Sequence, residues 1–60
     1  MKVGDIIQFK ATGVIGIIIN IWQVNAEFTD VKVFHNVPNI QNPTGFSLAH
    51  LEEVAAIVSS

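Results

Sequence analysis

The start of the chain alternates between apolar and polar residues with the two-residue period of a half-buried strand. From Val3 to Lys10, Ile7 and Phe9 fall on one parity, and Gln8 falls on the other. The triplet Ala11-Thr12-Gly13 interrupts this pattern with residues typical of a turn. We therefore expect a first strand over Val3–Lys10.

A denser strand signal follows this break. The segment from Val14 to Trp22 is crowded with β-branched residues, whose stiff side chains suit a pleated strand. Gln23-Val24-Asn25-Ala26 is suited to a hairpin turn, because asparagine tolerates the left-handed conformation. The alternation resumes from Glu27 to Phe34. We expect two strands joined by this turn.

The next segment has the composition of an irregular loop. His35 to Thr44 contains three asparagines and two prolines, which disfavour regular pairing. Gly45 to Ser47 can then form a short strand. We expect a long connection that ends in a fourth strand.

Near the end of the chain, a spacing of three separates Leu48, Leu51 and Val54. We expect a single helical turn there, followed by a short last strand around 56–58. The alternative is a helix of about three turns over 48–58, although a helix that short is marginal unless it packs against other elements. Short strand signals without a long helix indicate an all-β barrel or sandwich.

The parity of the two long strands assigns their side chains to two faces. If Gly16, Ile18 and, beyond a bulge, Ile21 face the core, the residues between them face the other side. By the same parity, the residues expected to point inward on the following strand are Thr29, Val31 and Val33. The residues expected to point outward on the two strands are Ile15, Ile17, Ile19, Trp22, Phe28, Lys32 and Phe34.

An outward face this apolar, with one lysine, is typical of a protein interface. The alternative is a strongly bent strand, both of whose faces enter the core. On the first reading, the candidate binding residues are Ile17, Ile19, Trp22, Phe28 and Phe34.

Composition supports an interaction function and argues against other classes. The chain has 60 residues, which allows a single domain over 1–60, and half of them are hydrophobic. Three lysines and five carboxylates give a net charge of −2, so neither nucleic acid nor a membrane is an expected partner. The run from Val14 to Trp22 is about half the length of a membrane helix. The amino terminus lacks the pattern of a signal peptide, which favours a cytoplasmic location.

No arrangement of side chains indicates catalysis. His35 and His50 lie fifteen positions apart without cysteine, so we expect no metal site. Glu52 and Glu53 are adjacent, which points them apart on a strand or turn instead of toward one cleft. No serine lies in a nucleophile elbow. We expect no enzyme activity, no cofactor and no small-molecule substrate, since so small a barrel has little concave volume.

Three motifs carry a resemblance to a known family. They are Val3-Gly4-Asp5-x-Ile7-x-Phe9, Gly13-x-x-Gly16-x-Ile18-x-x-Ile21 and Val31-x-Val33. Together, over about the first half of the chain, they resemble KOW-type SH3-like barrels of ribosomal and transcription-elongation proteins. The resemblance implies a turn at Gly13, a barrel corner at Gly16 and a bulge between Ile18 and Ile21. It implies an all-β, five-stranded antiparallel SH3-like barrel, with a short helical turn before the last strand.

The whole chain is also similar to short SH3-like proteins of tailed bacteriophages, most of which have no assigned function. This similarity implies a protein-interaction module in the host cytoplasm or in the virion, either self-associating or part of a larger assembly. A structural or regulatory accessory domain that acts on an enzyme is a further alternative, which the sequence does not separate from an interaction module. The alternative from the KOW family is a nucleic-acid-binding module that stacks bases on Trp22, Phe28 or Phe34.

Overall fold

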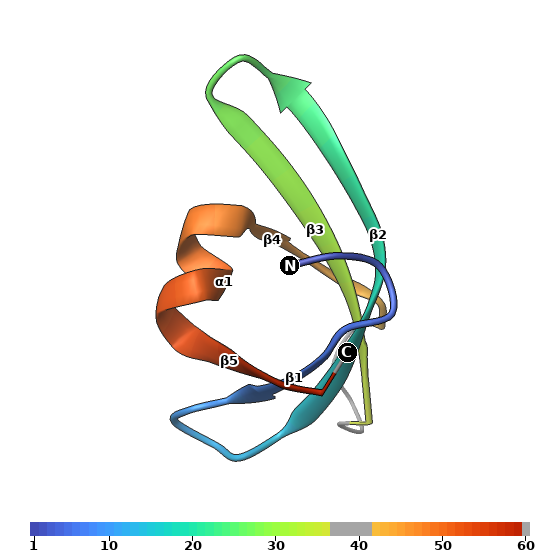
Figure 1. Cartoon of the computed structure of the whole chain (residues 1–60), viewed down its shortest axis with the longest axis vertical. Coiled ribbons are helices and arrows are strands. Elements are labelled where there is room, and N and C mark those ends of the chain that lie inside the picture. Colours follow the sequence, from blue (N-terminus) through green and yellow to red (C-terminus); the bar gives the residue numbers. More distant parts are fainter. Residues whose placement is uncertain (37–41, 60) are drawn as a thin grey trace.

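The described part of the chain folds into one antiparallel sheet with one short helix (Figure 1). A computed structural model describes residues 1–36 and 42–59. In chain order, the elements are β1 (Ile6–Phe9), β2 (Ile15–Asn25), β3 (Phe28–His35), β4 (Thr44–Ser47), α1 (Leu48–Val54) and β5 (Ala55–Ser59). The predicted all-β class, the five antiparallel strands and the helical segment before the last strand are confirmed.

The strand order in the sheet is β4-β3-β2-β1-β5, so β4 and β5 are its two edges. The expectation of a closed barrel is wrong, because the described parts of β4 and β5 do not pair with each other. Helix α1 follows β4 directly, leads directly into β5 and contacts both strands. The chain therefore joins the two edges through a helix, which lies across the open side of the curved sheet (Figure 1).

The core lies between the inner face of the sheet and α1. Its buried residues are Ile7, Ile18, Val31, Val33, Leu51 and Ala55. The inward assignments of Ile18, Val31 and Val33 are confirmed, and the partly buried Ile21 packs against this cluster. The alternative of a strand with both faces in the core is wrong for β2, because Ile17 and Ile19 are exposed.

The predicted bulge and glycine corner both appear in β2. Its register against β3 shifts between Ile18 and Asn20, which keeps Ile21 on the inner side. A Cβ atom at Gly16 would lie 2.6 Å from the Val33 Cγ1 atom, a distance that real contacts do not reach. Glycine at this position lets β3 pass close to β2. The other predicted turn glycine, Gly13, has a φ of 74°. Residues with a Cβ atom rarely adopt this backbone conformation.

Several element boundaries differ from the sequence prediction. Strand β1 begins at Ile6 instead of Val3, because Val3 and Gly4 form a turn in which Gly4 has a φ of 96°. The β2–β3 turn is Ala26-Glu27 and not 23–26. The Asn25 Oδ1 atom accepts a hydrogen bond from the Glu27 N–H at 2.9 Å, which stabilises the turn at this later position.

Helix α1 is longer than one turn and shorter than three. It begins after Ser47, whose hydroxyl accepts a hydrogen bond from the His50 N–H at 3.4 Å. It ends at Val54, because Ala55 is already extended, with a φ of −139°. The last strand therefore starts at Ala55, one residue earlier than expected. Of the predicted loop 35–44, His35 belongs to β3 and Thr44 to β4, and residues 37–41 lie outside the described part.

Candidate functional site

A row of apolar side chains crosses three strands on the outer face of the sheet. Ile6 of β1 pairs with Ile17 of β2, and Ile17 pairs with Phe34 of β3. Their chain neighbours Ile7 and Ile18 are buried on the inner face, so alternation directs this row outward. Ile17 is 39% exposed and Phe34 is 51% exposed. Directly opposed residues of this kind lie close enough to form one continuous surface.

This row borders an open hollow of about 210 Å³. The hollow is lined by Ile6, Ile15, Gly16, Ile17, Phe34, His35 and Asn36. Among the described residues, no aspartate, glutamate, lysine or arginine lines it. We call the four apolar side chains Ile6, Ile15, Ile17 and Phe34 the outer patch. Their arrangement suits an apolar contact.

Two further predicted contact residues lie farther along the outer face. Ile19 is exposed and sits at the bulge, where the register shifts. Trp22 pairs with Asp30, and the Lys32 Nζ atom lies 5.6 Å from the centre of its ring. Trp22 is exposed, but unlike the outer patch it lies among charged side chains.

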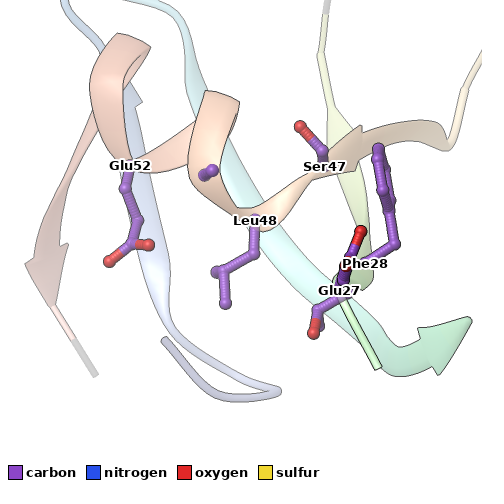
Figure 2. A pocket seen from close by; sticks show the side chains of 7 residues that line it. Glu27, Phe28, Ser47, Leu48 and Glu52 are labelled. Carbon is purple, nitrogen blue, oxygen red and sulfur yellow. The ribbon is translucent and has the colours of Figure 1, made fainter. Parts of the chain in front are cut away.

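Phe28 does not join the outer patch. It is exposed at the start of β3, beyond a second register shift near the hairpin tip. It lines a different hollow, of about 240 Å³, which we call the α1 hollow (Figure 2). Its lining residues are Glu27, Phe28, Thr29, Ser47, Leu48, Ala49 and Glu52. The predicted set of five contact residues is therefore divided. Two belong to the outer patch, two lie farther along the outer face, and Phe28 lines the α1 hollow.

Both histidines contact neighbouring side chains of the fold. His35 is buried, its Nε2 atom lies 2.9 Å from the Thr44 Oγ1 atom, and its backbone N–H donates to the Asn42 Oδ1 atom at 3.0 Å. The Asn42 Nδ2 atom donates in turn to the His35 carbonyl oxygen. His50 stacks on Phe46, with ring centres 6.5 Å apart. Within 1–36 and 42–59, no three histidine, aspartate or glutamate side chains group as metal ligands.

Asp5 is a buried polar residue that the sequence analysis did not single out. Its Oδ2 atom accepts a hydrogen bond from the Lys2 N–H at 3.0 Å, and its carbonyl oxygen accepts one from the Ile18 N–H at 3.0 Å. Its Oδ1 atom is buried without a hydrogen-bond partner in the described structure. Its parity, shared with Ile7 and Phe9, was the available signal. These bonds fix the turn that leads into β1.

Within the described ranges, no helix has the length and apolar character needed to cross a membrane. Comparisons with protein-family models, with curated proteins and with solved structures find no match to this chain.

Proposed function

We propose that this chain is a small, non-catalytic SH3-like module that binds another protein, or a second copy of itself, through the outer patch. The observation that carries the proposal is the outward-facing row formed by Ile6, Ile17 and Phe34 beside an apolar hollow. The strand order with a helix before the last strand is compatible with an SH3-like fold. The resemblance to phage SH3-like proteins adds an assembly or a host factor as the setting.

The physical argument rests on the cost of leaving this surface in water. Six hydrophobic residues form the buried core, whereas ten large hydrophobic residues are exposed in the described structure. Covering apolar surface stabilises a complex by about 25 cal/mol per Å² of area removed from water, before the costs of association. A patch without charged residues also has the composition found at the centre of interfaces. Association therefore supplies burial that so small a core cannot.

The nucleic-acid alternative has weaker support. Base stacking on a strand of nucleic acid requires aromatic rings along a positively charged groove. Trp22 lies opposite Asp30, and Phe28 lines a hollow that also contains Glu27 and Glu52. These carboxylates would repel phosphates. Phe34 belongs to the outer patch, so the three aromatic residues do not form one platform.

Serine substitutions in the outer patch test the proposal. We expect Ile17→Ser and Phe34→Ser to weaken self-association in sedimentation velocity, or binding to a purified partner first captured from the native cell. Val24→Ser is the matched control, because Val24 is exposed on the same strand outside the patch. An interface aromatic contributes about 2 kcal/mol or more when it is a hot spot, which corresponds to a loss of affinity of about thirtyfold.

The folding of each variant is checked by urea unfolding at a concentration where the chain is monomeric. The proposal is wrong if Ile17→Ser and Phe34→Ser associate and bind as the unchanged chain does. It is also wrong if Val24→Ser weakens binding as much as they do, since the loss would then not be specific to the patch.

A further inference from the structure

The α1 hollow lies on the other side of the sheet from the outer patch. Helix α1 packs on the inner face through the buried Leu51, and the β2–β3 hairpin extends beyond the helix (Figure 1). The hollow is bounded by the hairpin tip on one side and by Ser47 and α1, as far as Glu52, on the other. Two segments that lie far apart in the sequence therefore form its two walls.

The lining combines an apolar surface with two carboxylates. Phe28 is 53% exposed, and Leu48 projects into the hollow between Glu52 and Glu27 (Figure 2). Glu27 comes from the hairpin tip and Glu52 from the second turn of α1. In the described structure, neither carboxylate forms an ion pair. None of the three lysines lines the hollow.

The size of the hollow restricts its occupant. A volume of about 240 Å³ is below the range of about 300–1,000 Å³ that drug-sized ligands occupy, but it accommodates one long side chain. The charges restrict it further. The seven residues of α1 contribute little positive charge, and its cap residue Ser47 already accepts from the His50 N–H. The two carboxylates therefore dominate the local field.

We infer that the α1 hollow binds the side chain of a lysine or an arginine presented by a partner polypeptide. The aliphatic stem of either residue packs on apolar surface while its charged end stays near water. Here the stem contacts Leu48, and the charged end lies between Glu27 and Glu52. The exposed ring of Phe28 adds a cation–π contact. A phosphate or an acidic side chain would meet two like charges. This second contact goes beyond the outer patch and does not depend on it.

The test uses three blocked tripeptides that differ in one side chain: acetyl-Gly-Arg-Gly-amide, acetyl-Gly-Lys-Gly-amide and acetyl-Gly-Gln-Gly-amide. Backbone amide shifts of the full chain are followed by NMR during titration at low salt. We expect the arginine and lysine peptides to shift the amides of 27–29 and 48–52. We expect the glutamine peptide to leave them unchanged.

Glu52→Gln and Glu53→Gln form a matched pair, because both remove one charge from α1 and only Glu52 lines the hollow. We expect Glu52→Gln, and likewise Glu27→Gln, to weaken binding of the arginine peptide about twofold to fivefold, the modest effect of a partly exposed ion pair. Glu53→Gln is expected to change it little.

Two results would overturn the inference. One is an equal response to the glutamine peptide, which would show that charge is not recognised. The other is an equal weakening by Glu53→Gln, which would show general attraction to an acidic protein. Phe34→Ser separates this inference from the proposed function. It removes part of the outer patch and is expected to leave peptide binding unchanged.

Discussion

The inner and outer faces of β2 and β3 carry similar residue types in opposite surroundings. Ile18 and Val33 are at most 1% exposed, whereas Ile17 and Phe34 are 39% and 51% exposed. Hydrophobicity alone does not distinguish the two faces. The difference arises because the one helix covers the inner face only, through the buried Leu51. A sheet with a single covering helix leaves its other face without a second layer.

The largest expected effect is a difference in the free energy of unfolding between substitutions of two adjacent isoleucines, Ile17 and Ile18. We expect Ile18→Ala to lower the free energy of unfolding by about 2–5 kcal/mol, because it leaves a cavity in the core. Ile17→Ala is expected to cost about 1 kcal/mol or less, the size of a cross-strand contact. A chain of 60 residues has a total stability of about 3–9 kcal/mol, so Ile18→Ala approaches global unfolding.

Urea unfolding followed by circular dichroism measures both variants. It is carried out at a protein concentration where the chain is monomeric, so that a lost interface does not contribute. Equal losses for Ile17→Ala and Ile18→Ala would contradict the assignment of the two faces.

A smaller effect is expected where the two strands approach each other. In Gly16→Ala the new methyl group would meet the Val33 Cγ1 atom at 2.6 Å and the Phe34 carbonyl oxygen at 3.3 Å. We expect a loss of about 1–3 kcal/mol from this overpacking. Gly45→Ala is the control, since its nearest neighbour, an Asp30 carboxylate oxygen, lies at an ordinary 3.5 Å. Equal urea midpoints for the two variants would show that β2 and β3 can separate at no cost.

The two-face arrangement was predictable because it depends on local periodicity. Alternation placed Ile18 and Val33 inward and Ile17 and Phe34 outward, and the three-residue step to Ile21 indicated the bulge. These features arise from the two-residue period of a strand and from one extra residue. Neither requires knowledge of distant parts of the chain.

Tertiary placement was not predictable in the same way. Among the described residues β4 and β5 do not pair with each other, and α1 connects them. The pattern of Leu48 to Val54 does not reveal how far that helix extends. Phe28 is exposed as expected, but it lies beside the second register shift at the hairpin tip and lines the α1 hollow instead of the outer patch. Glu27 and Glu52 are twenty-five positions apart, and only the fold places them on one hollow.

The smallest expected effect concerns Trp22, the one outward aromatic with a charged neighbour over its ring. The Lys32 Nζ atom lies 5.6 Å from the ring centre, within the range of a cation–π contact. For an exposed pair we expect a coupling of about 0.5–1 kcal/mol between Trp22→Leu and Lys32→Met in a double-mutant cycle of urea unfolding. Pairing Trp22→Leu with Lys10→Met is the control. Lys10 follows β1, and in the described structure the lysine placed over the ring is Lys32, so these two changes should be additive.

Trp22 differs from the residues of the outer patch because its neighbour across the ring is the charged Lys32. The small coupling expected for this pair means that the contact contributes little to folding. If Lys32 holds the ring in place, removing the lysine while keeping Trp22 should alter its fluorescence without a large change in the unfolding midpoint. The ring then remains available to a partner, and Lys32→Met should affect partner binding less than Phe34→Ser does, because Phe34 lies in the apolar row and Lys32 lies beyond it. Additivity of Trp22→Leu and Lys32→Met would show that the observed contact contributes nothing to folding.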